Sequence, residues 1–182
     1  MHDTKTRIVE AGNRIFYESG FISVRVEDVL EAAGASRGSF YKFFDHKTNL
    51  AEEVLKSRAS QYEDFLTESI NQSSGFSEGI TAVFTSLIEW DEIHGSHGCL
   101  FQTSKIELGD RQEIIAVAIT HKQKVQKILH DFLLKHGGSE PDRGASSLML
   151  LMEGAIALAN VGSCKEHFSN ALYTAKKIFE VE

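Results

Sequence analysis

The amino-acid sequence predicts an all-α protein of about nine helices. The chain has 182 residues but a single proline, and turns between strands usually recruit proline and glycine. Hydrophobic residues make up 42% of the chain, which is enough for a packed core. They recur mostly at intervals of three and four residues, as expected of helices with one buried face. The length allows one large domain or two small ones.

Two helices with tight ends are predicted near the N-terminus. The first ends at Gly20 and carries an apolar stripe of Ile8, Ala11, Ile15 and Phe16. The second is shorter, ends at Gly34 and carries a stripe of Val26, Val29, Leu30 and Ala33. A glycine at each end favours a sharp change of chain direction, because glycine adopts the left-handed conformation readily.

A third short helix is predicted over about residues 37–43. Ser36 precedes it and offers a side-chain oxygen as N-cap. Phe40 and Phe44 are expected to point inward. The stretch "AAGAS" that joins this helix to the second is short, so the two helices form a compact pair.

Helical spacing continues through most of the remaining chain. The "NQSSG" stretch at 71–75 is the strongest interruption. Pro141 is tolerated in the first turn of a later helix. The predicted helices lie near residues 47–70, 77–93, 111–136, 141–160 and 166–179.

The charge distribution restricts where a polyanion can bind. The net charge is −7, which argues against general nucleic-acid affinity over the whole surface. Residues 1–50 hold seven basic and seven acidic side chains, whereas residues 51–182 hold twelve basic and nineteen acidic ones. Contacts with a polyanion are therefore expected in the N-terminal part alone.

Other compositional features favour a cytoplasmic protein. Its two cysteines do not form a C-x-x-C motif, which is typical of a reducing compartment. The first residues are polar and do not resemble a signal peptide. The longest apolar run is interrupted by Glu153 and is too short to cross a bilayer, so no membrane contact is expected.

The two short helices around "AGAS" are typical of a helix-turn-helix unit. Such a unit places its second helix in the major groove of DNA, with hydrogen-bond donors near the start of that helix. The segment "SRGSFYKFFDHK" supplies donors, and a glycine where backbone can approach the duplex. A solvated helical hairpin is the alternative. The residues predicted to contact DNA are Arg25, Ser36, Arg37, Gly38, Ser39, Tyr41, Lys42 and Lys47.

Residues 5–50 resemble the DNA-binding domain of TetR-type (TetR/AcrR) transcriptional regulators. The motifs that carry the resemblance are "VEDVLEAAGAS" and "RGSFYKFFDHKTNL". The resemblance implies a homodimeric all-α regulator, usually a repressor, that a ligand releases from double-stranded DNA. It implies a helix-turn-helix domain over residues 1–48 and an effector-binding and dimerisation domain over residues 49–182. By position, the family's DNA contacts correspond to Ser39, Tyr41, Lys42 and Lys47.

Two residues depart from the family pattern. Arg25 stands where a small hydroxyl residue often starts the second helix, so it either contacts phosphate or lies in solvent. Phe43 stands where histidine or tyrosine is common, and its ring has no polar group for a phosphate.

The last two helices carry more apolar surface than one side of a small domain can cover. Either the helix near 141–160 is central in its own core, or it pairs with a second copy in a four-helix interface. A dimer would space two recognition helices about one DNA turn apart, as a palindromic operator requires. The predicted interface residues are Leu148, Leu151, Ala155, Leu158, Phe168, Leu172, Ala175 and Phe179.

A pocket for a small-molecule effector is expected among the helices between residues 77 and 160. Trp90 and His121 are the strongest candidates, because each adds a polar group to an apolar helix. Each candidate can equally be a core residue. The candidates are Phe84, Leu87, Trp90, Cys99, Phe101, Ile114, Ala118, His121 and Met152.

The segment "IHGSHGCLF" at residues 93–101 permits three interpretations. His94, His97 and Cys99 can be metal ligands, although a tetrahedral site needs a fourth partner. "GCLFQTSKIELG" resembles a branch of TetR-type regulators in which the matching cysteine sometimes reacts with electrophiles. A thiol at a helix N-terminus has a lowered pKa, which suits that role. In the third interpretation Gly98 makes a turn and Cys99 packs as a small apolar residue.

No sequence motif indicates an enzyme. There is no glycine-rich phosphate loop, G-x-S-x-G or H-E-x-x-H motif, so neither catalytic residues nor a cofactor is expected. The alternative to a DNA-binding regulator is a helical adaptor, which would not need the "RGSFYKFF" segment.

Overall fold

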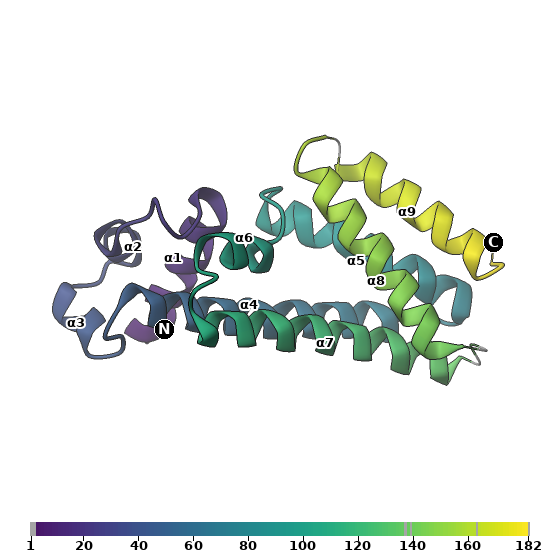
Figure 1. Ribbon diagram of the computed structural model, residues 1–182, viewed down its shortest axis with the longest axis horizontal. Coiled ribbons are helices and arrows are strands. Elements are labelled where there is room, and N and C mark those ends of the chain that lie inside the picture. The colour runs from purple at the N-terminus through teal and green to yellow at the C-terminus, as the bar shows by residue number, and fades with distance from the viewer. Residues whose placement is uncertain (1–2, 137, 139, 163, 182) are drawn as a thin grey trace. The chain divides into compact units, whose positions relative to one another are not determined.

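The structure, a computed structural model, describes residues 3–136, 138, 140–162 and 164–181. Within these ranges the chain forms nine helices and no strand, which confirms the predicted all-α class (Figure 1). None of the described helices combines the length and the apolar character needed to cross a membrane. The helices are α1 (Thr4–Ser19), α2 (Val26–Ala33), α3 (Arg37–Tyr41), α4 (Lys47–Asn71), α5 (Phe76–His94), α6 (Leu100–Glu107), α7 (Gln112–Lys135), α8 (Pro141–Ala159) and α9 (Cys164–Ile178).

The chain packs as two compact units, each with its own core. The head unit comprises residues 1–60 and 99–120, and the body unit comprises residues 61–98 and 121–182. Helix α6 and the start of α7 therefore pack in the same unit as the first three helices. The predicted boundary after residue 48 follows the DNA-binding motif rather than the packing, and it stays a prediction.

The head unit is built around aromatic side chains. Phe40 and Phe44 are 1% and 2% exposed, so the prediction that both point inward is confirmed. Their ring centroids are 5.3 Å apart, and those of Phe16 and Phe21 are 4.9 Å apart. Burying such a side chain contributes about 1.5–3 kcal/mol. Three residues of the second segment complete this core: Leu100, Phe101 and Ile114.

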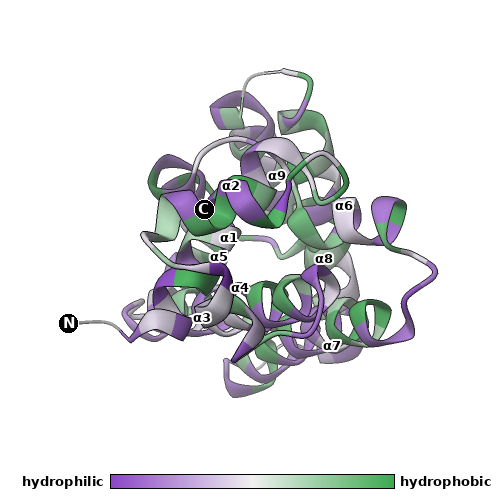
Figure 2. Cartoon of the chain, turned by 90° about the vertical axis from the view of Figure 1, so that its left-hand side faces the viewer, coloured by the Kyte–Doolittle hydropathy of each residue, from purple (hydrophilic) through white to green (hydrophobic). Residues whose placement is uncertain are grey.

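In the body unit α9 packs against both α5 and α8. Hydrophobic residues cover only part of the circumference of most helices, which leaves a polar face for solvent (Figure 2). Gly79 of α5 lies directly against the ring of Phe132, and a Cβ at this position would be 2.2 Å from ring atom Cε2. This close approach therefore requires glycine, unless the ring moves.

Helix α3 is shorter than predicted and ends at Tyr41 rather than near residue 43. The reason is a tightened last turn. The backbone N–H groups of Phe43 and Phe44 both donate to the carbonyl oxygen of Phe40, each at 2.9 Å. An i→i+3 bond of this kind commonly closes a helix. It also turns Phe44 into the core.

Candidate functional site

The first turn of α3 is fixed by Ser36. Its backbone is extended, with φ −93° and ψ 160°, and its hydroxyl oxygen accepts the N–H of Ser39 at 3.1 Å. The two serine hydroxyl oxygens are 3.0 Å apart. Ser36, predicted as a DNA contact, therefore acts as the N-cap of the recognition helix in this structure. An N-cap of this kind contributes about 1 kcal/mol.

The outer face of α3 carries most of the predicted DNA contacts. Arg37, Gly38 and Lys42 are exposed, and Tyr41 is 64% exposed. Phe40 lies beneath this face and contacts the Tyr41 ring edge-on, with centroids 5.3 Å apart. The buried phenylalanine thus anchors a surface of hydroxyl, guanidinium and ammonium donors. These are the groups that contact base edges and phosphates in DNA.

Acidic residues of α2 hold the two arginines that are predicted to contact DNA. Arg25 donates to the Asp28 carboxylate at 2.7 and 3.3 Å, and Arg37 forms an ion pair with Glu27. The hydrogen bond from Arg25 is the main cause that lowers the pKa of Asp28. Both pairs are exposed, so solvent and salt screen them and each contributes little to stability. Either guanidinium can therefore exchange its carboxylate for a phosphate at low cost.

Lys47, predicted as a DNA contact, is partly buried and binds backbone carbonyl groups of the head unit. Its ammonium donates to the carbonyl oxygens of Phe21 at 2.7 Å, Val24 at 2.8 Å and Ile22 at 3.4 Å. These three acceptors belong to the turn between α1 and α2. Lys47 belongs to the head unit, and in this structure its ammonium stabilises the turn between α1 and α2.

Comparison with known proteins finds similarity to bacterial transcriptional regulators. A family model described as bacterial regulatory proteins of the TetR family matches residues 8–54. The HTH-type transcriptional repressor NemR of Escherichia coli is 26% identical over 187 residues, which cover 97% of this chain and 94% of that repressor. The matched segment is thus a DNA-binding domain of the TetR type, and the relatives support a DNA-binding regulator rather than an enzyme.

Solved structures of this family have the same fold. The crystal structure of reduced E. coli NemR is 22% identical and has a TM-score of 0.84 over 97% of both chains. A TetR-family regulator from Streptomyces coelicolor is 20% identical and has a TM-score of 0.88, covering 97% of this chain and 94% of that one. The fold likeness thus extends beyond the matched helix-turn-helix segment.

The predicted effector residues fall into two groups. Phe101 and Ile114 are 6% and 0% exposed within the aromatic core of the head unit, where they stabilise that unit. Cys99 and Ala118 pack at the edge of the same core. The body unit holds the other group, which consists of Phe84, Leu87, Trp90, His121 and Met152.

An aromatic cluster surrounds the two strongest effector candidates. The ring centroid of Tyr62 is 5.2 Å from that of Trp90 and 6.0 Å from that of His121. Phe65 and His94 also contact Trp90, at centroid distances of 5.6 and 3.9 Å. Tyr62 and Phe65 lie on α4 and were not among the predicted effector residues, because no local signal marked them as part of a site.

His121 is a buried titratable group in this cluster. It is 4% exposed, and its Nδ1 lies 3.0 Å from Oε1 of Glu63. Lys124 donates to the other oxygen of that carboxylate at 3.1 Å. Burial lowers the pKa of His121, and the hydrogen bond with Glu63 opposes this effect only in part. The imidazole is therefore neutral at pH 7 and can donate or accept one hydrogen bond per nitrogen.

The segment that joins α5 to α6 contains two turns. Gly95 and Gly98 have φ values of +91° and +78°, which glycine adopts readily. Cys99 follows as the N-cap of α6 and is partly buried. Among the described residues, no three His, Cys, Asp or Glu side chains gather closely enough to hold a metal ion. The turn at Gly98 and the packing of Cys99 agree with the third of the three interpretations.

The head unit contains a buried arginine. Arg58 is 5% exposed, and its guanidinium lies 3.9 Å from the ring centroid of Tyr17. It also donates to Oδ1 of Asn13 at 3.2 Å. Burial lowers the pKa of Arg58, and the charges of Tyr17 and Cys99 partly offset this. No local sequence pattern indicated that this arginine would be buried.

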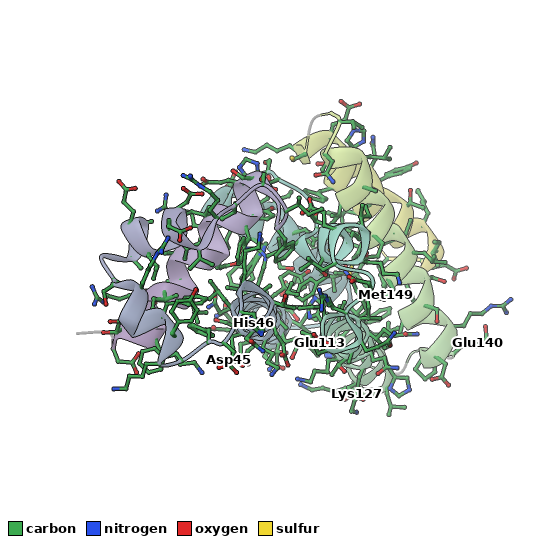
Figure 3. All side chains as sticks on the ribbon, turned by 60° about the vertical axis from the view of Figure 1, so that its left-hand side comes forward. Asp45, His46, Glu113, Lys127, Glu140 and Met149 are labelled. Atoms are coloured by element: carbon green, nitrogen blue, oxygen red, sulfur yellow. The ribbon has the colours of Figure 1, made fainter. Side chains whose placement is uncertain are left out.

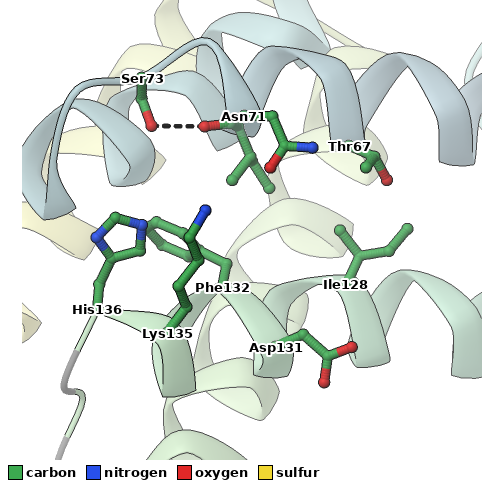
Figure 4. Close-up of a pocket in the computed structure, with 9 residues that line it drawn as sticks. Thr67, Asn71, Ser73, Ile128, Asp131, Phe132, Lys135 and His136 are labelled. Carbon is green, nitrogen blue, oxygen red and sulfur yellow. Dashed lines mark hydrogen bonds between the residues drawn. The ribbon is translucent and has the colours of Figure 1, made fainter.

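A surface cavity of about 190 Å³ lies in the body unit, near the ends of α4 and α7 (Figure 4). Its lining combines apolar side chains with the polar groups of Asn71, Lys135 and His136. None of the predicted effector residues lines it. The apolar part consists of Ile70, Ile128 and Phe132.

The predicted dimer interface separates into core and surface residues. Four of its members are at most 4% exposed in a single chain, because α8 and α9 pack against each other; they are Leu148, Ala155, Phe168 and Ala175. These four are core residues of the body unit rather than part of an outer face. Leu158 is 52% exposed, and Leu151, Leu172 and Phe179 are partly buried.

A different stripe of α8 faces outward. Leu150 and Leu158 are 75% and 52% exposed, and Val161, just after the helix, is 86% exposed. Gly154 lies between them on the same face, with open space where a Cβ would be. The spacing of four, four and three residues places all of them on one side of the helix.

Proposed function

We propose that this chain is a homodimeric repressor that binds a palindromic operator and leaves it when an effector or an electrophile binds. The observation that carries the proposal is the exposed face of α3. There Arg37, Tyr41 and Lys42 are presented by a helix that is anchored through Phe40. The relative NemR is named a transcriptional repressor, which supports repression.

The outward stripe of α8 supports a dimer. Leu150, Gly154, Leu158 and Val161 form an apolar face with a glycine near its middle, where two helices can approach closely. Isolated exposed leucines are common, but a one-sided series along a helix marks an interaction surface. Two copies joined through this face would present two recognition helices to one operator.

The aromatic cluster of the body unit supports an effector site. Tyr62, Trp90 and His121 combine apolar rings with polar groups, as small-molecule sites do. Trp90 is the single tryptophan of the chain, so its fluorescence reports on this cluster alone. Binding of an effector in the body unit would shift the population towards a state with low DNA affinity.

Cys99 supports the second mode of release. It is the N-cap of α6, a position at which reactive cysteines occur. Attack of this thiolate on an electrophilic carbon would place a bulky group at the start of α6. If this mode operates, Cys99→Ser should bind DNA normally but resist release by N-ethylmaleimide, while Cys164→Ser should still be released. An unchanged response of Cys99→Ser would eliminate this thiol as the sensor.

A gel-shift titration tests the proposed function. The probe is the DNA upstream of the protein's own gene, together with fragments of the whole genome. Binding that weakens steeply with salt is expected of a protein that neutralises phosphates. Absence of binding to every fragment at low salt would favour the helical adaptor instead.

A further inference from the structure

The turn between α1 and α2 is held from outside by two charged side chains. Oε2 of Glu107, the last residue of α6, accepts the backbone N–H groups of Phe21 at 2.6 Å and Ile22 at 2.8 Å. Lys47 donates to carbonyl oxygens of the same turn, including that of Phe21 at 2.7 Å. One turn of the head unit therefore has its donors bound by a carboxylate and its acceptors bound by an ammonium.

Gly20 allows the carboxylate to approach the turn. Its φ is +77°, and a Cβ at this position would lie 2.5 Å from Oε1 of Glu107. Any larger residue would displace the carboxylate as well as strain the backbone. The conformation of the turn and the position of Glu107 are thus mutually dependent.

This turn determines how the chain enters α2. Val24, whose carbonyl oxygen accepts from Lys47 at 2.8 Å, immediately precedes Arg25, the N-cap of α2. The other end of α2 is tied to α1, because Arg7 donates to the carbonyl oxygen of Ala33 at 3.1 Å. Since α2 packs against both α1 and α3, its placement controls that of the recognition helix.

We propose that Glu107 is a positioning residue for DNA recognition. Its carboxylate makes α6 a structural part of the reading head, although the residue lies far outside the matched segment 8–54. Glu107 touches no DNA in this proposal. It acts by holding the turn that places α2 and α3, and a displacement of α6 would remove both of its hydrogen bonds together. The proposal rests on the DNA-binding function inferred above.

The first test needs no DNA. Backbone amide exchange is measured for the wild type, Glu107→Gln, Glu107→Ala and the matched control Glu113→Gln. Glu113 lies in the first turn of α7 in the same unit, is exposed, and loses the same charge (Figure 3). We expect the Phe21 and Ile22 amides to exchange about tenfold faster in both Glu107 variants, with unchanged rates in the control. Unchanged rates in Glu107→Ala would overturn the proposal.

The second test separates positioning from general stability. Affinity is measured for a duplex selected from random DNA by the wild type and for poly(dI-dC). Mispositioned recognition helices should lower the ratio of specific to non-specific affinity about tenfold in Glu107→Gln, with the salt dependence unchanged. An equal loss for both DNAs would show that Glu107 only stabilises the fold, and would overturn the proposal.

The two tests also distinguish this proposal from the function on which it rests. If the wild type selects no duplex at all, the proposed DNA-binding function fails, and with it the role of Glu107 in recognition. Faster exchange of the Phe21 and Ile22 amides in Glu107→Ala than in that wild type would still show that the carboxylate holds the turn. Specific DNA binding with an unchanged specificity ratio in Glu107→Gln would leave the function standing and overturn the role of Glu107 alone.

Discussion

The head unit and the body unit use polar groups in different ways. In the head unit two charged side chains, those of Lys47 and Glu107, bind backbone groups of one turn. In the body unit the buried polar group His121 pairs with a side chain, Glu63, amid aromatic rings. The first arrangement fixes the geometry of a rigid surface. The second leaves hydrogen-bonding capacity inside an apolar environment, which suits recognition of a small molecule.

The largest expected effect is the difference in stability between a core substitution and a surface substitution in the head unit. Phe40→Ala should lower the free energy of unfolding by about 3–5 kcal/mol, because it removes a buried ring. Tyr41→Ala, one residue on, should change it by less than about 0.5 kcal/mol and should weaken DNA binding instead. Thermal and chemical unfolding measure the first effect. A similar loss of stability in both variants would contradict the division between core and contact face.

The outer stripe of α8 offers the next test. Leu158→Glu should weaken self-association by about 100-fold, because a charge would be buried between two apolar faces. Sedimentation equilibrium measures the association constant. Leu134→Glu on α7, where the leucine is 61% exposed, is the matched control and should leave the association unchanged. Equal effects of both substitutions would place the interface elsewhere.

The substitution Lys47→Met tests whether Lys47 stabilises the fold or contacts a DNA phosphate. Loss of the charged donor should lower the free energy of unfolding by about 1–3 kcal/mol. If the ammonium contacted a phosphate, the slope of log affinity against log salt would also fall by about one. The structure predicts that this slope stays the same, since the donor is engaged by Phe21 and Val24. A reduced slope would restore the phosphate contact.

The smallest expected effect concerns pH and the body unit. Burial lowers the pKa of His121 below its ordinary value of 6.5, so the unfolded chain takes up a proton at a higher pH than the folded chain does. The free energy of unfolding should therefore fall as the pH drops below about 6.5 and level off once the folded imidazole is protonated. His121→Gln should reduce this dependence. His46→Gln, in the exposed turn before α4, should retain it (Figure 3).

The sequence predicted the features that depend on local spacing. The inward position of Phe40 and Phe44 follows from helical periodicity next to an N-cap, and both are buried. The exposed donors of α3 follow from the same periodicity. Contacts between distant residues were not predictable in this way. Glu107 and Phe21 are 86 residues apart, and only the packing of α6 into the head unit brings them together.

The proposed dimer face shows a second limit of sequence reasoning. Helix α8 is apolar on most sides, so its sequence does not reveal which side α9 covers. Residues predicted for the interface, such as Leu148 and Ala155, proved to be core, whereas Leu150 and Val161 are exposed. When a helix is apolar on most sides, its neighbours rather than its own residue pattern decide which side is buried.

The most direct test of the account is a salt titration of DNA binding by the wild type, Lys42→Ala and the control Lys105→Ala. Lys42 lies on the exposed face beyond α3, whereas Lys105 is an exposed lysine on α6. We predict that Lys42→Ala alone weakens binding to the selected duplex and lowers the salt slope by about one. Equal behaviour of all three proteins would contradict the claim that the face of α3 binds DNA.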